Sequence, residues 1–281
     1  MCDQKHFDED GEKYSRRDFH AMAAAALGVA VLPQTANAVA VTEREVVIET
    51  PDGKCDAHFV TPAKGKHPAV LVWPDIFGLR PAFRQMGKRL AESGYSVLTV
   101  NPFYRKQKAP TAGKGAQTPI RDVIPLYRSL NAKTNVTDAK AFVAWLDSQE
   151  QVNAKKKIGT TGYCMGGPIV MRTAGTVPER IGAAATFHGG GLLTGAKDSP
   201  HLLIPKSKAQ FLIAIAENDD KREPDTKGKL KKAFADARLK AEVKVFPAGH
   251  GWCPTDTKVY NKQQAELAWA RMLAMFRKTL A

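Results

Sequence analysis

Hydrophobic and polar positions alternate along the chain in a way that predicts a mostly parallel sheet covered by helices. Apolar runs of four to seven residues are separated by longer stretches in which apolar residues recur every three or four positions. This alternation of buried strands with amphipathic helices is typical of doubly wound α/β proteins, whose helices cover both faces of the sheet. The expected strands are Ala69 to Trp73, Tyr95 to Val100, Lys157 to Thr161, Ile181 to Phe187, Phe211 to Ala216 and Val243 to Phe246.

Two further strand-like runs come first and predict an opening hairpin. They are Glu45 to Glu49 and Ala57 to Val60, and they flank the turn sequence Pro51-Asp52-Gly53. The segment from Asn101 to about Asn131 has no clear period, so we expect a long loop there, and loops of that length are usually functional or disordered. Helices are expected at about Pro81 to Ser93, Asp138 to Ser148, Pro224 to Leu239 and Lys262 to Leu280.

The first 38 residues have the features of an export leader. The apolar stretch Ala21 to Leu32 is too short to span a bilayer but has the length of a signal-peptide core. The pair Arg16-Arg17 precedes it and the small-x-small site Ala36-Asn37-Ala38 follows it, an order that resembles a twin-arginine export signal. Five acidic residues before the Arg pair depart from that pattern, and an amphipathic first helix is the alternative. We therefore expect residues 1–38 to be a signal peptide, residues 39–281 to be one folded domain, and the protein to be periplasmic.

The charge of the chain is strongly basic. Removing residues 1–38 takes away four Lys/Arg and six Asp/Glu, which raises the formal net charge from +14 to +16. Such a charge can attract nucleic acid, but the lysines are dispersed and have no aromatic residues among them. We expect a solvated surface or weak steering of acidic substrates, with no nucleic-acid partner and no stable membrane association.

Three cysteines remain after the leader, namely Cys55, Cys164 and Cys253. An odd number leaves at least one thiol unpaired in an oxidising compartment, and the sequence leaves open whether Cys55 pairs with Cys253. Their spacing matches no metal-binding motif, so neither a metal nor a cofactor is expected.

One cysteine lies in a sequence that predicts a nucleophile elbow. Gly162-Tyr163-Cys164-Met165-Gly166-Gly167 follows a strand and precedes a helix-compatible run. The sharp turn strains the backbone at its central residue and requires small neighbours, which glycine provides. The thiol is thereby placed beside a helix N-terminus, which favours the thiolate.

An acid and a histidine follow this elbow in the order that α/β-hydrolases use. One later strand ends in Ala216-Glu217-Asn218-Asp219-Asp220, and the next ends in Pro247-Ala248-Gly249-His250-Gly251-Trp252. His250 is the predicted base for Cys164, and Asp219 is predicted to orient it, with Asp220 as the alternative. The oxyanion hole is expected to use the backbone N–H of Met165 and that of Ile76, in the loop Pro74-Asp75-Ile76-Phe77-Gly78.

Five sequence elements together resemble the dienelactone hydrolase family over nearly all of Val46 to Leu280. They are the G-x-C-x-G-G elbow, D-I-F-G, N-P-F-Y-R (Asn101 to Arg105), A-E-N-D and G-H-G-W. The resemblance implies an α/β-hydrolase fold, hydrolysis of small esters or lactones without a cofactor, and an acyl-thioester on Cys164 that water, activated by His250, then hydrolyses.

The resemblance also implies substrate-binding residues, with two departures from the family. Asp75 matches an acidic residue that interacts with the cysteine, but glutamate is typical there. Arg105 matches one of two arginines that hold a substrate carboxylate, whereas the chain has no arginine for the second after His250. An ester or lactone other than dienelactone is therefore at least as well supported. Trp252 is expected as a pocket wall or as packing, and His188 is given no catalytic role.

Two other functions use the same sequence features. A binding protein can retain a hydrolase fold without turnover, because fold does not fix function. A hydrolase of thioesters or peptides would use the same three residues. The expected partners are a small-molecule ester or lactone and, during secretion, the twin-arginine export machinery.

Overall fold

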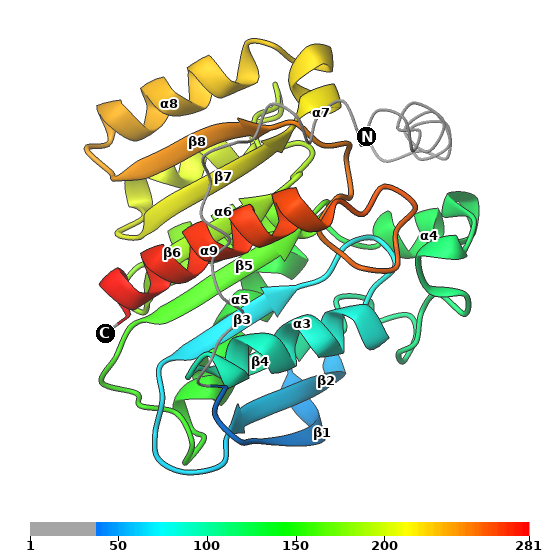
Figure 1. Cartoon of the computed structure of the whole chain (residues 1–281), viewed down its shortest axis with the longest axis vertical. Helices are drawn as coiled ribbons and strands as arrows, with labels where there is room; N and C mark the ends of the chain where they lie inside the picture. The colour runs from blue at the N-terminus through cyan, green and yellow to red at the C-terminus, as the bar shows by residue number, and fades with distance from the viewer. Residues whose placement is uncertain (1–37, 281) are drawn as a thin grey trace.

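The computed structural model of the protein describes residues 38–280, so the predicted leader lies outside the described residues except for Ala38. These residues form one eight-stranded sheet with the strand order β1-β2-β4-β3-β5-β6-β7-β8 (Figure 1). All pairs from β4 to β8 are parallel, as the apolar runs predicted. The predicted fold class, a mostly parallel α/β sheet with helices on both faces, is confirmed.

The two antiparallel strands form the predicted hairpin at one edge of the sheet. β1 (Val41–Thr50) and β2 (Gly53–Pro62) pair over their whole length, from Val41 opposite Pro62 to Thr50 opposite Gly53. Both strands are longer than their apolar cores predicted, because polar residues on the exposed face extend the ladder. β2 then pairs antiparallel with β4 (Ser96–Val100), which joins the hairpin to the parallel strands.

The parallel strands are buried on both faces, which explains why they are nearly continuous apolar runs in the sequence. Their carboxyl ends lie along one edge of the sheet, where ligands bind in open α/β proteins. Besides β4, they are β3 (Ala69–Trp73), β5 (Ile158–Tyr163), β6 (Ile181–Phe187), β7 (Gln210–Ala216) and β8 (Ala241–Phe246).

Helices cover the two faces in separate groups. α3 (Pro81–Glu92) and α9 (Lys262–Thr279) share one apolar cluster with the sheet and lie in front of it in Figure 1. α5 (Ala132–Asp147), α6 (Gly166–Thr176) and α8 (Thr226–Asp236) pack against the opposite face in a second cluster. No helix among the described residues is long and apolar enough to cross a membrane.

Helix α5 begins six residues before the predicted start at Asp138. Asn131 and Thr134 form a capping box, in which the Asn131 side chain accepts from Thr134 N at 3.0 Å and Thr134 Oγ1 accepts from Asn131 N at 2.9 Å. The two bonds satisfy backbone donors that the first turn of a helix leaves free. The apolar periodicity did not predict this polar first turn, because such a pattern indicates only the part of a helix that packs against the apolar core.

The segment predicted as a long loop contains helical structure. It includes the 3₁₀ helix η1 (Gly115–Gln117) and α4 (Ile120–Tyr127). Ile120 and Val123 of α4 are buried in a small apolar cluster that also contains Cys164. The segment therefore packs over the predicted nucleophile. Two other short elements were not predicted: η2 (Pro200–Lys206) and α7 (Glu217–Arg222).

Candidate active site

Cys164 lies at the turn between β5 and α6 with a φ of 51°. A positive φ is uncommon for a residue other than glycine, and such strain is concentrated at functional sites. The Cys164 N–H donates to Phe187 O at the end of β6 at 3.0 Å, and the residue is only 1% exposed. The strained turn predicted for a nucleophile elbow is present at this cysteine.

The glycines on either side of Cys164 are required by close backbone contacts. A Cβ on Gly162 would lie 2.4 Å from Gly166 O, and a Cβ on Gly166 would lie 2.4 Å from Trp73 O. Real Cβ atoms do not approach backbone atoms so closely, so any side chain at either position would displace the turn. The second contact also presses the elbow against the end of β3, where the loop that carries Ile76 begins.

His250 and Asp219 meet at the carboxyl edge of the sheet. His250 Nδ1 donates to Asp219 Oδ2 at 2.7 Å, and His250 N donates to Asn218 Oδ1 at 2.9 Å. The neighbouring Asp220 instead forms an ion pair with Lys227, with 2.7 Å between Oδ2 and Nζ. Of the two aspartates that the sequence left open, Asp219 is the one that the structure places against the histidine.

His188, to which sequence reasoning gave no catalytic role, packs directly against His250. The two ring centroids are 5.1 Å apart, and His188 also lies edge-on to Trp252 at 5.0 Å. His188 is buried, has a φ of 41°, and neither of its ring nitrogens has a hydrogen-bond partner among the described residues. Burial, and then the nearby His250, lower the pKa of His188 well below its usual value, which keeps its imidazole neutral.

The residues predicted to form the oxyanion hole lie beside the nucleophile. Ile76, Phe77, Cys164 and Met165 belong to the same buried cluster. Met165 is the N-cap of α6, so the thiol lies at the positive end of that helix.

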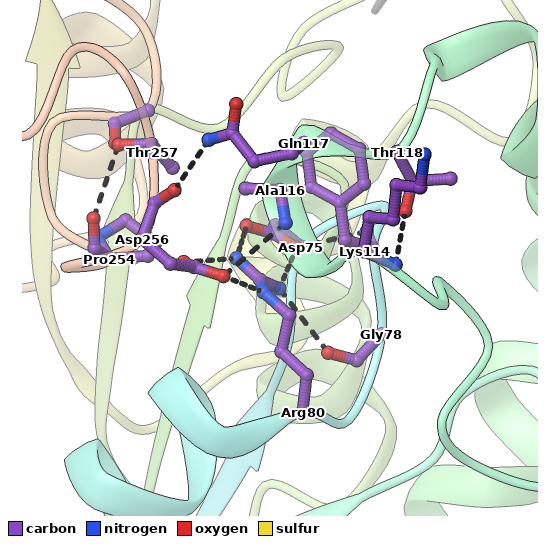
Figure 2. Close-up of polar contacts among 12 residues, drawn as sticks. Asp75, Gly78, Arg80, Lys114, Ala116, Gln117, Thr118, Pro254, Asp256 and Thr257 are labelled. Atoms are coloured by element: carbon purple, nitrogen blue, oxygen red, sulfur yellow. Dashed lines mark hydrogen bonds and ion pairs between the residues drawn. The ribbon is translucent and has the colours of Figure 1, made fainter.

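Asp75, which precedes Ile76, is held by a buried arginine (Figure 2). Arg80 NH1 and NH2 donate to the two Asp75 carboxylate oxygens at 2.6 and 2.9 Å, and Phe77 N donates to Asp75 Oδ1 at 2.9 Å. Arg80 also binds Asp256, a residue of the segment that follows His250. Sequence reasoning missed Arg80 and Asp256, because nothing in the sequence indicates that positions 176 residues apart form an ion pair.

Arg105, the predicted ligand of a substrate carboxylate, is also paired with two carboxylates. Its guanidinium donates to Asp138 at 2.6 and 2.9 Å and to Asp52 at 2.6 and 3.0 Å. It lies over the Tyr104 ring, 4.5 Å from the centroid. These contacts tie the hairpin turn to α5, and the predicted role in anion binding has no direct support from them.

Trp252 is fully buried, with 0% exposed surface. Its ring stacks on Phe246 with centroids 5.5 Å apart and meets His188 on another side. Of the two roles expected for it, packing beside the histidines is the one that these contacts describe.

The three cysteines of the described region are free thiols, so Cys55 and Cys253 form no disulfide. Burial raises the pKa of the Cys55 thiol, which donates to Asn101 O at 3.4 Å, and burial likewise raises the pKa of Cys253. Both thiols therefore resist ionisation. No group of three or more His, Cys, Asp or Glu side chains among the described residues could hold a metal ion.

The profile of the family described as "Dienelactone hydrolase family" matches residues 55–280. The chain belongs to the dienelactone hydrolase family. The match includes the elbow, the loop of Ile76 and the segments that carry Asp219 and His250.

Curated relatives of this family member are similar over most of their length. A candidate carboxymethylenebutenolidase of Escherichia coli (strain K12) is 26% identical over 256 residues, covering 83% of this chain and 90% of the relative. Another from Synechocystis is 25% identical over 226 residues, covering 78% and 89%.

Solved structures show the same fold. A dienelactone hydrolase candidate from Klebsiella pneumoniae superposes with a TM-score of 0.75 at 24% identity and covers 85% of this chain and 99% of its own. A dienelactone hydrolase-like promiscuous phosphotriesterase from metagenomic libraries gives 0.72 at 21% identity, with 86% and 100% covered. An acylaminoacyl peptidase from Pyrococcus horikoshii gives 0.63 at 15% identity and covers 85% of this chain but 42% of its own.

Proposed function

We propose that this member of the dienelactone hydrolase family cleaves small carboxylic esters or lactones with Cys164 as nucleophile, His250 as base and Asp219 as the residue that orients His250. The observation that carries the proposal is the 2.7 Å hydrogen bond from His250 Nδ1 to Asp219 Oδ2, at the sheet edge where Cys164 occupies a strained elbow. That bond fixes the ring tautomer, which leaves Nε2 free of its proton and able to accept one.

In the proposed first step, His250 takes the Cys164 proton and the thiolate attacks the substrate carbonyl carbon. The carbonyl oxygen becomes an oxyanion, stabilised by the N–H groups of Ile76 and Met165. The C–O bond to the leaving group then breaks, and the leaving oxygen takes the proton from His250. The product of this step is an acyl-thioester on Cys164 and a free alcohol.

In the second step, His250 removes a proton from a water molecule, whose oxygen attacks the thioester carbonyl. The C–S bond breaks, the thiolate is released and is protonated again by His250, and the acid leaves. A lactone follows the same path, except that its alcohol and acid remain in one molecule.

Asp75, Arg105 and Trp252 have supporting roles in this proposal. Asp75 is engaged by Arg80 and by Phe77 N, so it holds the shape of the oxyanion loop. Arg105 braces the hairpin against α5 through Asp52 and Asp138, and Trp252 packs behind His188.

A hydrolysis screen of the purified protein against aryl esters, lactones and thioesters tests the reaction class. We expect multiple turnovers on an ester or lactone, and labelling of Cys164 by an electrophilic ester. Binding or a single labelling event without turnover would instead support a non-catalytic binding protein. Faster turnover of thioesters or peptides would support the other alternative.

We also propose that the protein is exported to the periplasm through the twin-arginine pathway, on the basis of Arg16, Arg17 and the site ending at Ala38. Replacing both arginines with lysine should trap an unprocessed precursor in the cell. Recovery of that double variant from the periplasm, cut after Ala38, would contradict the proposal.

A further inference from the structure

Arg80 is the buried cation nearest in sequence to the proposed oxyanion loop. Its guanidinium is already hydrogen-bonded to two carboxylates, those of Asp75 and Asp256. We propose that Asp256, through its ion pair with Arg80, makes the site select substrates with neutral acyl groups and reject substrates whose acyl group carries a carboxylate. The inference rests on the proposed esterase function and adds a substrate class to it.

The Arg80 guanidinium has no donor left for a substrate. A guanidinium has five N–H donors. Arg80 makes two hydrogen bonds to Asp75 at 2.6 and 2.9 Å, two to Asp256 at 2.7 and 3.0 Å, and one to Gly78 O at 3.3 Å (Figure 2). Its side chain is only 1% exposed. A substrate carboxylate would have to displace one of these carboxylates to bind.

The ion pair lies against the residues that surround the nucleophile. The Arg80 guanidinium lies over the Phe77 ring, 5.4 Å from the centroid, and Phe77 belongs to the cluster that contains Cys164. Asp256 Oδ2 also accepts from Ala116 N at 3.3 Å, and Ala116 packs against the same cluster.

Asp256 is further tied to the histidine loop. Its neighbour Thr257 donates from Oγ1 to Gly251 O at 2.9 Å, next to His250. Asp256 therefore joins three segments around the site, namely the loop of Ile76, η1 and the loop of His250 (Figure 2).

Asp256 places a negative charge in this cluster. Burial would raise the pKa of Asp256, but the hydrogen bond and charge of Arg80 outweigh burial and lower it, so Asp256 is ionised at neutral pH. Burial raises the pKa of Asp75, so the carboxylate whose charge offsets that of Arg80 is that of Asp256. A substrate carboxylate brought near this ion pair meets no unpaired cation and is repelled by Asp256, because charges in a partly buried site are poorly screened.

Arg105, the other arginine implicated in anion binding, is likewise paired with two carboxylates. Arg105 is shared between Asp138, whose side chain is 2% exposed, and Asp52, so its positive charge is offset by these partners. Neither arginine thus offers an unpaired positive charge, although the chain as a whole is strongly basic. Any preference for neutral substrates must come from such local pairing, since the overall charge favours anions.

The test compares two aryl esters of similar length, p-nitrophenyl hexanoate and mono-p-nitrophenyl glutarate, whose acyl chain ends in a carboxylate. We expect the wild-type kcat/KM to favour the hexanoate by about tenfold or more, because like charges brought together cost binding energy. In Asp256→Asn, which keeps an acceptor for Arg80 but loses the charge, the preference should shrink by about fivefold, through a lower KM for the glutarate ester.

Asp52→Asn is the matched control, since it removes the same charge from the Arg105 pair. It should leave the ratio between the two esters as in the wild type, because Arg105 lies over Tyr104, which belongs to a different apolar cluster from Cys164. If it raises glutarate hydrolysis as much as Asp256→Asn does, Arg105 is the anion site and the proposal is wrong.

Two other outcomes overturn the inference. A wild-type enzyme that cleaves the glutarate ester as well as the hexanoate would overturn it even if Asp256→Asn fails to fold. An unchanged ratio in a folded Asp256→Asn variant would do the same. Failure of the proposed function looks different, because neither ester would then be turned over.

Discussion

The Asp219 carboxylate lies 2.7 Å from His250 Nδ1, whereas its neighbour Asp220 pairs with Lys227 at the same distance. Adjacent residues on α7 point in different directions, so only one of them can orient the histidine. Asp219 and Asp220 therefore have different partners. Replacing each of them with asparagine tests which one orients His250.

Asp219→Asn should lower kcat/KM by roughly 10²–10⁴-fold, because the amide no longer favours the tautomer that leaves Nε2 unprotonated. Asp220→Asn is the matched control and should cost less than about tenfold, since it loses only a partly exposed ion pair. Steady-state kinetics on one aryl ester measures both. A larger loss in Asp220→Asn would reassign the triad acid.

Replacing the nucleophile should stop the reaction without unfolding the protein. We expect Cys164→Ala to lower turnover by roughly 10⁴-fold or more, and His250→Ala nearly as much, because triad residues act as a unit. Circular dichroism and thermal unfolding check the fold, and Cys55→Ala is the control that removes a thiol from elsewhere. All three thiols are buried, but iodoacetamide should modify Cys164 before Cys55 and Cys253, because burial raises the pKa of those two and the thiolate is the reactive form. Wild-type turnover in Cys164→Ala would place the chemistry at another residue.

The elbow should tolerate no side chain at Gly166. A Cβ there would lie 2.4 Å from Trp73 O, so Gly166→Ala should lower the free energy of unfolding by roughly 1–3 kcal/mol and reduce activity as well. Gly228 in α8 is the control, because a Cβ on it meets nothing within 4 Å. Gly228→Ala should leave activity intact and raise stability by up to about 1 kcal/mol. Urea unfolding measures both, and equal effects would show that the close contact is absent.

His188 should make the protein less stable in acid. Burial keeps it neutral in the folded state, whereas the unfolded chain takes up a proton with a pKa near 6.5. The unfolded state therefore binds more protons below that pH, and this residue can reduce the free energy of unfolding by up to about 1.4 kcal/mol per pH unit as the pH falls.

The variant His188→Asn tests this, since asparagine tolerates the φ of 41°. Unfolding curves between pH 7 and about pH 5 should have a smaller pH slope than those of the wild type. Some slope should remain, because burial also lowers the pKa of His58, in the hairpin. A variant with the full wild-type slope would show that His188 is not the residue that titrates.

Much of this protein could be predicted from local sequence. Apolar runs such as Ala69 to Trp73 are strands because a parallel strand is buried on both faces, and the hairpin turn follows from Pro51-Asp52-Gly53. The elbow at Cys164 could be predicted because its strained turn requires glycines at fixed spacing. These features depend on backbone sterics and burial, which act over a few residues.

Only the tertiary structure decided which side chains meet. It placed Asp219, and not Asp220, against His250, brought His188 beside that ring, and paired Arg80 with Asp256 across the chain. It also showed that Arg105 is held by Asp138 and Asp52. A sequence shows which charged and aromatic residues are present, but their partners depend on how loops from different strands come together at the sheet edge. That arrangement arises only when the whole sheet has formed.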